Sequence, residues 1–167
     1  TTEFDWETAL EAEREAVWGE EAYPVFRERV RPGARVLIMG DNAGEIGLDT
    51  LLVKVLSERG AEVTYAVRDK PVLNDATMAD AERVGMTRLC RVVSSGSDAP
   101  GAVLDRLNPA TRKLMGESHV LLSKGQGNFE SLEGRVANVF FALKAKCRVV
   151  ARALDVEQGA SVFVHHE

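Results

Sequence analysis

An unbroken apolar run that ends in a glycine-rich polar turn constrains the fold of this chain more than any other stretch. The run is Val36–Met39, and the turn at residues 40–47 has the sequence Gly-Asp-Asn-Ala-Gly-Glu-Ile-Gly. An apolar run bounded by turn residues is typical of a parallel strand that is buried on both faces. Because ligands of open parallel sheets bind outside the carboxyl ends of the strands, Asp41 and Asn42 become candidates for chemistry.

Helix-like and strand-like segments alternate through the rest of the chain. Apolar runs that predict strands lie at residues 35–39, 62–67, 89–93, 119–122, 147–151 and 161–164. Segments that predict helices lie at about 46–59, 74–84, 100–107, 109–115 and 135–144. The alternation predicts an α/β fold with a mostly parallel sheet and right-handed crossovers.

Residues 1–30 are predicted to be helical. Asp5 can cap the first helix, and apolar residues between positions 6 and 17 recur at roughly helical spacing. We therefore expect a helical segment over residues 1–32, which packs on the sheet or is the remnant of a larger helical region. One α/β domain over residues 33–167 is expected to follow it.

Composition disfavours several classes of function. The chain of 167 residues has a net charge of −5 and no basic run, so a nucleic acid is not an expected partner. No apolar segment approaches the length of a membrane span, and the N-terminus lacks the layout of a signal peptide. Cys90 and Cys147 form no Cys-x-x-Cys pair, which predicts two buried thiols in a reducing compartment. We expect a cytoplasmic protein without a membrane partner.

Unusual polar residues gather after the predicted strands rather than before them. Asp41 and Asn42 follow the first strand, and Asp75 follows the second. Residues 94–98 follow the third strand and residues 124–128 the fourth. If each strand is followed by its helix, all four loops lie at one edge of the sheet. The first three residues offer only oxygen ligands, which suit a hard divalent cation such as Mg²⁺ or Mn²⁺.

Two of these three residues also have a purely structural explanation. Asp75 can cap the helix that follows it, and Asn42 can occupy a turn because asparagine tolerates a left-handed backbone. Asp41 is harder to explain in this way, since an acid at the end of a buried strand needs a partner. Three protein ligands would leave open positions for water and a substrate oxygen.

A second cluster, Lys124–Asn128, has the sequence Lys-Gly-Gln-Gly-Asn, which favours a phosphate-binding loop. Glycines leave backbone N–H groups free to face an anion, and the lysine adds a positive charge. The spacing is not that of a P-loop. Residues 95–98 can add hydroxyl and N–H donors or simply cap a helix. Lys144 closes the predicted apolar helix, whose C-terminus a cation can satisfy.

Five motifs occur in an order that resembles a known family. They are Gly-Asp-Asn-Ala-Gly-Glu (40–45) with Asp49, Val-Leu-Asn-Asp-Ala-Thr (72–77) with Asp80, Ser-Gly-Ser-Asp-Ala-Pro-Gly (95–101), Ser-Lys-Gly-Gln-Gly-Asn-Phe-Glu (123–130) and Phe-Ala-Leu-Lys-Ala-Lys-Cys (141–147). Together they resemble the damage-control, metal-dependent phosphatases formerly called domain-of-unknown-function family 89. The Lys-Gly-Gln-Gly-Asn form resembles the branch found mostly in archaea and bacteria. The resemblance covers roughly residues 33–165.

The resemblance implies a Rossmann-like three-layer α/β/α fold that hydrolyses phosphate monoesters of small metabolites, such as sugar phosphates or damaged and surplus phosphometabolites. It implies a divalent metal (Mn²⁺, Co²⁺ or Ni²⁺, with Mg²⁺ also used) held by Asp41, Asn42 and Asp75. The catalytic residues would be Asp41, Asp75, Lys124 and Lys144. The residues expected to contact the substrate are Asp41, Asn42, Ser95, Lys124, Gly125, Gln126, Gly127, Asn128 and Lys144.

The route of phosphate transfer stays open at this point. Asp41 or Asp75 would either orient the attacking water or act as the nucleophile. An aspartyl-phosphate route normally uses an Asp-x-Asp pattern, and position 43 is Ala, which weighs against it without deciding the matter.

Two other functions are kept as alternatives. Members of the resembled family usually carry a longer helical region before the α/β part, whereas about 30 residues precede the first strand here. On the first alternative, the chain is a non-catalytic metal- or phosphate-binding fragment that needs a helical partner chain. An oligomer is the other partner left open. The glycine-containing turn, with Asp69 after the second strand, also faintly resembles an S-adenosylmethionine-dependent methyltransferase. Gly40, Gly44 and Gly47 lack its Gly-x-Gly-x-Gly spacing.

Overall fold

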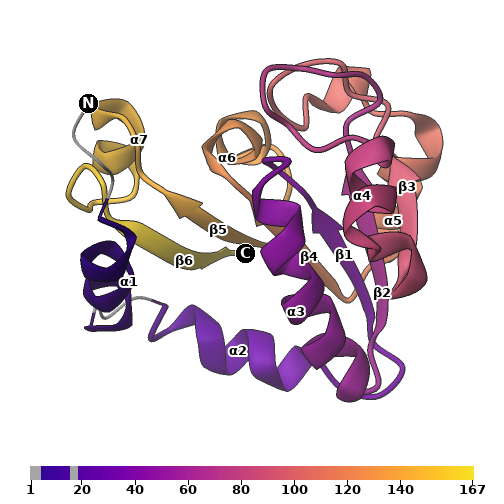
Figure 1. Ribbon diagram of the computed structural model, residues 1–167, viewed down its shortest axis with the longest axis horizontal. Helices are drawn as coiled ribbons and strands as arrows, with labels where there is room; N and C mark the ends of the chain where they lie inside the picture. The colour runs from indigo at the N-terminus through magenta and orange to yellow at the C-terminus, as the bar shows by residue number, and fades with distance from the viewer. Residues whose placement is uncertain (1–4, 16–18) are drawn as a thin grey trace.

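Six strands form one sheet with helices on both of its faces (Figure 1). The structure is a computed structural model that describes residues 5–15 and 19–167, so Val17 of the predicted first helix lies outside the described residues. The strands are β1 Arg35–Met39, β2 Glu62–Val67, β3 Arg91–Ser94, β4 Val120–Lys124, β5 Val139–Lys144 and β6 Ser161–His166.

Helices α1 and α2 precede the first strand, and the later helices connect successive strands. They are α1 Trp6–Glu15, α2 Ala22–Arg29, α3 Glu45–Glu58, α4 Met78–Val84, α5 Pro109–Glu117, α6 Gln126–Leu132 and α7 Arg148–Ala153, with 3₁₀ turns η1 Met86–Arg88 and η2 Leu104–Arg106. None of the helices in the described part of the chain combines the length and the apolar character that a bilayer crossing requires.

The strand order β3-β2-β1-β4-β5-β6 places β1 at the centre of the sheet. Strands β1 to β5 pair in parallel, and β6 pairs antiparallel with β5 at the edge. This arrangement confirms the predicted α/β fold with a mostly parallel sheet. Because the chain builds outward from β1 first on one side and then on the other, a topological switch point lies between β1 and β4, where ligands of such sheets bind.

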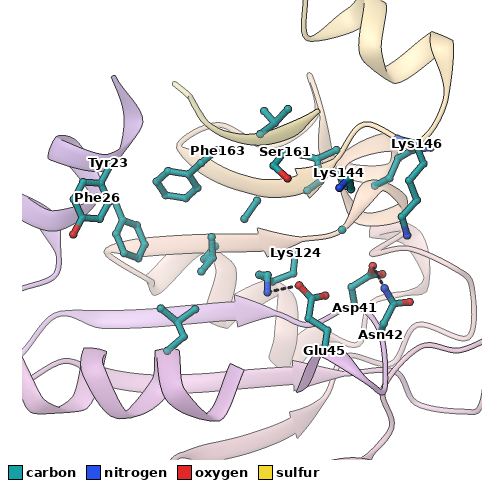
Figure 2. A pocket seen from close by; sticks show the side chains of 17 residues that line it. Tyr23, Phe26, Asp41, Asn42, Glu45, Lys124, Lys144, Lys146, Ser161 and Phe163 are labelled. Atoms are coloured by element: carbon teal, nitrogen blue, oxygen red, sulfur yellow. Dashed lines mark hydrogen bonds and ion pairs between the residues drawn. The ribbon is translucent and has the colours of Figure 1, made fainter. Parts of the chain in front are cut away.

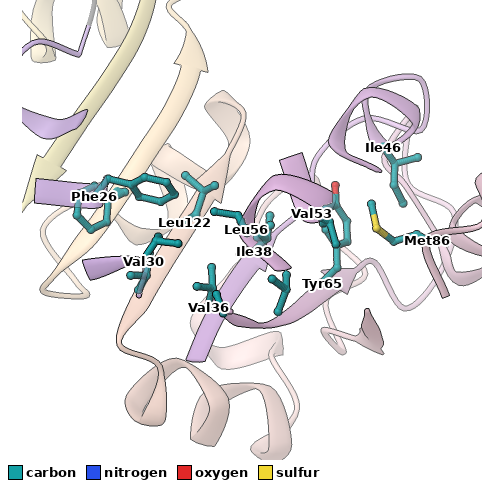
Figure 3. Packing of buried hydrophobic residues seen from close by; sticks show 14 of the residues in the cluster. Phe26, Val30, Val36, Ile38, Ile46, Val53, Leu56, Tyr65, Met86 and Leu122 are labelled. Carbon is teal, nitrogen blue, oxygen red and sulfur yellow. The ribbon is translucent and has the colours of Figure 1, made fainter. Parts of the chain in front are cut away.

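Alternating side chains of the strands supply two separate apolar cores. Val36 and Ile38 of β1 pack beneath α2, α3 and α4 (Figure 3), whereas Leu37 and Met39 pack on the opposite face with α6 and α7. A strand that is buried on both faces shows no polar–apolar alternation, which is why Val36–Met39 is an unbroken apolar run. The strand ends at Met39, and Asp41 is the second residue of the loop that follows it.

Two predicted elements after β4 are wrong. Residues 135–144 were expected to form a helix, but Val139–Lys144 forms strand β5, and residues 147–151 were expected to form a strand, but Arg148–Ala153 forms helix α7. In β5, Phe140 belongs to one core and Phe141 to the other. Short apolar runs buried on both faces do not distinguish helix from strand by periodicity. Lys144 therefore ends a parallel strand, not a helix.

Caps explain two helix ends, one as predicted and one differently. Asp5 accepts hydrogen bonds from the Thr8 backbone N at 3.1 Å and from Thr8 Oγ1 at 2.6 Å, as a cap of α1 should. Helix α4 is capped by Thr77, which forms a capping box with Asp80. The purely structural explanation of Asp75, that it caps this helix, is therefore wrong. Asp75 is thereby free of the capping role.

Helix α2 shares the core of the sheet. The ring of Phe26 meets Phe140 and Phe163 edge to face, with centroid distances of 5.3 and 5.5 Å. Such pairs add about 1 kcal/mol beyond the burial of their area. The packing attaches residues before position 33 to the α/β unit, and the division of the chain at residue 32 stays a prediction.

Candidate active site

Two loops at the carboxyl edge of the sheet bring the predicted metal ligands together. An isolated β-bridge joins Asn42 to Asp75. The Ala76 backbone N donates to the Asp41 carbonyl at 2.7 Å, and the Ala43 backbone N donates to the Asn74 carbonyl at 2.8 Å. The loop after β1 and the loop after β2 are thus fixed side by side by backbone hydrogen bonds, independently of the acids they carry.

Asp41 lies almost buried at the end of β1, with a fractional exposure of 9%. Asn42 Nδ2 donates to Asp41 Oδ2 at 3.1 Å, and Arg68 Nη2 lies 4.0 Å from Asp41 Oδ1. Burial raises the pKa of Asp41 to about 6, and the charges of Asp75 and Glu45 add to this. The free carboxylate is therefore unfavourable here without a further cation.

Arg68 is a site residue that the sequence reasoning missed. It follows β2 directly and is only 2% exposed. Its Nε donates to Asp75 Oδ2 at 2.6 Å, and its Nη2 donates to Asn128 Oδ1 at 2.8 Å. Its position could have identified it, because a charged residue at the end of a buried apolar strand needs a partner.

Lys124 ends β4 and is held by two carboxylates of α3. Its Nζ lies 2.6 Å from Glu45 Oε1 and 2.7 Å from Asp49 Oδ1. Tyr65 Oη donates to Asp49 Oδ2 at 2.7 Å. Burial alone would lower the pKa of Lys124, but Asp49 and Glu45 outweigh burial and hold it above its ordinary value. Glu45 and Asp49 were quoted in the first motif, yet no role was predicted for them.

The charges at this edge fit a divalent cation. Four carboxylates (Asp41, Glu45, Asp49 and Asp75) are paired with two cations, Arg68 and Lys124, which leaves an excess of two negative charges among these six groups. The charge of Lys146, across the pocket, offsets one of them. Within residues 5–15 and 19–167, no three His, Cys, Asp or Glu side chains form a ligand group. A metal here would therefore use Asn42 as the third donor beside Asp41 and Asp75, an all-oxygen set that suits Mg²⁺ or Mn²⁺.

A pocket of about 520 Å³ opens beside the acids. Asp41, Asn42 and Glu45 line one end of it, and Lys144 and Lys146 lie across from them (Figure 2). The rest of its wall is mostly apolar and aromatic, with contributions from Tyr23, Phe26, Leu52, Leu122, Val162 and Phe163. The pocket thus combines acids that suit a cation with lysines that suit an anion.

The two lysines of β5 and its following loop differ in their contacts. Lys144 Nζ lies 2.7 Å from Glu13 Oε1 of α1, so its charge is shared with an acid of the N-terminal segment. The Lys146 backbone N donates to Gln126 Oε1 at 2.9 Å, and the charge of Lys146 opposes the rise in the pKa of Asp41. Lys146 was not among the predicted site residues, although it stands in the last motif.

The predicted phosphate loop is more structural than its sequence suggested. Gln126, Gly127 and Asn128 form the first turn of α6 rather than a loop. The Gly125 backbone N is already bonded to the Ala142 carbonyl at 2.9 Å. A side chain on Gly127 would collide with the Pro100 carbonyl, so this glycine allows α6 to approach the loop between β3 and η2.

The predicted substrate residues divide between the pocket and the interior. Lys124, Gly125, Gln126 and Lys144 line the pocket with Asp41 and Asn42. Ser95 and Asn128 are fully buried outside its lining, and Ser95 Oγ accepts from the Ser97 backbone N at 3.2 Å. Contact of Ser95, Gly127 and Asn128 with a substrate stays a prediction.

The burial of Asp41 predicts an unusual pH dependence of the metal-free protein. The folded pKa of about 6 exceeds the reference value of 3.8, so the stabilising contribution is fully present below about pH 4 and is lost as the pH rises through 6. The loss corresponds to about 3 kcal/mol. Urea denaturation in chelator at pH 4.5 and 7.5 measures it as the difference between wild type and Asp41→Asn. An unchanged difference at the two pH values would contradict the prediction.

Residues 1–162 match the family model described as the damage-control phosphatase ARMT1-like domain. The chain is similar to the damage-control phosphatase PH1575 of Pyrococcus horikoshii, with 37% identity over 142 residues. A damage-control phosphatase of Archaeoglobus fulgidus is 36% identical over 139 residues. These alignments cover 84% and 81% of this chain but 50% and 48% of the two relatives, so the chain spans about half their length.

A solved structure shares the fold closely. The crystal structure of a DUF89 family protein, PH1575 of Pyrococcus horikoshii, superposes with a TM-score of 0.89 at 34% sequence identity. The superposition covers 98% of this chain and 58% of that chain. The strands and helices are therefore arranged as in a solved DUF89 family protein, which agrees with the expected α/β fold.

Proposed function

The chain belongs to the ARMT1-like damage-control phosphatase family, and on that premise we propose that it is a metal-dependent hydrolase of phosphate monoesters. The observation that carries the proposal is that negatively charged and positively charged side chains line opposite sides of one pocket. Asp41 and Asn42 stand at one end, and Lys144 and Lys146 stand across from them. A phosphate ester that bridges a divalent cation and a pair of lysines would satisfy both halves of the pocket.

The residues proposed to hold the metal are Asp41, Asn42 and Asp75. When bound, a divalent ion neutralises charge on the phosphate oxygens and leaves coordination positions for water. Among Mn²⁺, Co²⁺, Ni²⁺ and Mg²⁺, the oxygen donors suit Mn²⁺ and Mg²⁺ best. The proposal is supported by the excess of negative charge around these residues, where four carboxylates face the cations Arg68, Lys124 and Lys146.

Hydrolysis adds water across the ester P–O bond and releases inorganic phosphate and an alcohol. Asp41 faces the pocket and is proposed to orient the attacking water, because Ala43 occupies the second acidic position of an Asp-x-Asp pattern. Lys124 and Lys144 are proposed to bind the phosphate and to share the charge that develops on its oxygens. For Lys124 to do so, the phosphate must compete with Glu45 and Asp49 for its ammonium group.

The proposed substrates are small phosphorylated metabolites, including sugar phosphates and damaged or surplus phosphometabolites. A volume of about 520 Å³ accommodates a ligand of that size. The printed names of the relatives, damage-control phosphatase, favour the same class for this chain.

Removal of metal provides the direct test. We expect hydrolysis of p-nitrophenyl phosphate in Mn²⁺ or Co²⁺ to fall to background in EDTA and to return when excess metal is added. The physical reason is that two carboxylates without a cation repel the phosphate they should help to bind. Calcium, which prefers more ligands at longer distances, serves as the control ion. Activity that persists in chelator would overturn metal dependence.

A second candidate function is a metal- or phosphate-binding fragment that needs a helical partner. The observation that favours it is an exposed apolar stripe on α3, where Leu48, Leu51 and Val55 are 71%, 59% and 53% exposed. Stripes of this kind mark contact surfaces. Metal binding without turnover, with turnover restored by a separately expressed helical region of a longer relative, would favour this candidate over the first.

A further inference from the structure

A buried arginine fixes the relative position of the three loops that form the candidate site. We propose that Arg68 is a positioning residue, which orients Asp75 and, through Asn128, locks the carboxyl ends of β1 and β4 beside it. This inference rests on the proposed function, because it assigns Arg68 the task of preorganising the metal-binding carboxylates. It assigns no contact between Arg68 and the substrate.

The guanidinium group of Arg68 divides its donors between an acid and an amide. Nε donates to Asp75 Oδ2 at 2.6 Å, and Nη2 donates to Asn128 Oδ1 at 2.8 Å. The same Nη2 lies 4.0 Å from Asp41 Oδ1, so one cation faces both acidic ligands. Since one oxygen of Asp75 is bound by Arg68, the carboxylate has a defined orientation before any metal arrives.

Asn128 extends this network to the central strands. Its Nδ2 lies 3.0 Å from the Gly40 carbonyl oxygen and 2.8 Å from the Lys124 carbonyl oxygen. These carbonyls follow β1 and end β4, the strands on either side of the switch point. A single arginine–asparagine pair therefore connects the ends of β2, β1 and β4. Lys124 ends β4, and Asp41 and Asp75 lie in the loops that follow β1 and β2.

Arg68 and Asn128 are both buried, which suits a positioning role rather than a catalytic one. Arg68 and Asn128 are 2% and 0% exposed, and both lie outside the lining of the pocket. The contacts of the Arg68 side chain in this structure are with Asp75, Asn128 and Asp41, and none of them requires a substrate. A guanidinium is suited to the task because its planar fork serves two acceptors at fixed angles, which a lysine ammonium does not reproduce.

Metal binding by charge-conserving variants tests the inference. Arg68→Lys keeps the positive charge and removes the fork, and Asn128→Ala breaks the link to β1 and β4 without changing any charge. Loss of a group that orients a metal ligand typically weakens metal binding by about 10- to 100-fold. We expect an increase of this size in the Mn²⁺ dissociation constant of both variants, measured by isothermal titration at constant pH and ionic strength.

A core truncation separates positioning from a general loss of stability. The control variant is Leu56→Ala. Leu56 lies near the end of α3, at the opposite edge of the sheet, and packs in the core cluster that contains Val36 and Val63. The substitution should lower the melting temperature while leaving the Mn²⁺ dissociation constant within about twofold of wild type. Circular dichroism confirms that each variant is folded at the temperature of the titration.

Each outcome decides the matter. Weakened Mn²⁺ binding in Arg68→Lys and Asn128→Ala, but not in Leu56→Ala, supports positioning. Wild-type affinity in Arg68→Lys, or equal weakening in Leu56→Ala, overturns it while leaving the proposed metal site standing. An absence of Mn²⁺ binding by the wild-type protein overturns the proposed function, and the inference falls with it.

Discussion

Asp41→Asn is expected to lower phosphatase turnover by about a thousandfold and to make the metal-free protein more stable. Turnover falls because the amide removes the charge of a proposed metal ligand, which is also the group proposed to orient water, and loss of one such electrostatic contact costs about 10²- to 10³-fold. Stability rises because the buried carboxylate, with a pKa raised to about 6, is ionised at neutral pH in surroundings that favour its neutral form. The gain is about 3 kcal/mol at pH 8.

The two opposite effects make the experiment decisive. Turnover of p-nitrophenyl phosphate is measured with saturating Mn²⁺, and unfolding by urea is measured in EDTA. Asp105→Asn is the matched control, because Asp105 is an exposed acid of η2 and its replacement should change stability by less than about 0.5 kcal/mol. An Asp41→Asn protein that is inactive because it is less stable than wild type would contradict the assigned role.

Sequence patterns predicted the strands and helices that are bounded by turn residues or by a capping glycine. Strand β1 occupies Arg35–Met39 and β2 occupies Glu62–Val67, the ranges expected from apolar runs bounded by turn residues. Helix α4 ends at Gly85 in the left-handed conformation that glycine favours. Strand β5 lacked such a signal, because Phe140 and Phe141 enter opposite cores and the run is equally compatible with a buried helix.

In the candidate site, the residues that follow strands could be predicted from local sequence, whereas the contacts that depend on strand order could not. That Asp41, Asn42 and Asp75 meet follows from one rule, since carboxyl ends of parallel strands share an edge. The role of Arg68 depends on β2 and β4 being the two neighbours of β1, and no local pattern specifies that order. The same holds for Lys124, whose partners Glu45 and Asp49 lie on α3. Residues that follow strands, such as Asp41 and Lys124, were thus predictable, whereas the ion pairs that Lys124 and Arg68 form were not.

Gly125→Ala is expected to lower activity by at least about 100-fold and to destabilise the protein by at least about 3 kcal/mol. Gly125 has φ +79° and ψ 159°, a region that is almost restricted to glycine and costs other residues about 1–3 kcal/mol. A Cβ at this position would also collide with the Asp41 carboxylate. The clash forces either the Asp41 side chain or the β4–α6 turn to move, and both belong to the candidate site. A displacement of about 1 Å in such a site costs about 10²-fold in rate.

Gly134→Ala separates the two causes. Gly134 also has a positive φ, +66°, but a Cβ there meets nothing within 4 Å, so the variant pays only the backbone cost of about 1–2 kcal/mol. It should retain wild-type turnover and Mn²⁺ affinity, whereas Gly125→Ala should lose both even at a temperature where it is fully folded. Urea denaturation, Mn²⁺ titration and turnover on the same preparations distinguish these results. If Gly125→Ala bound Mn²⁺ as tightly as Gly134→Ala, the close contact between Gly125 and Asp41 would have no part in shaping the site.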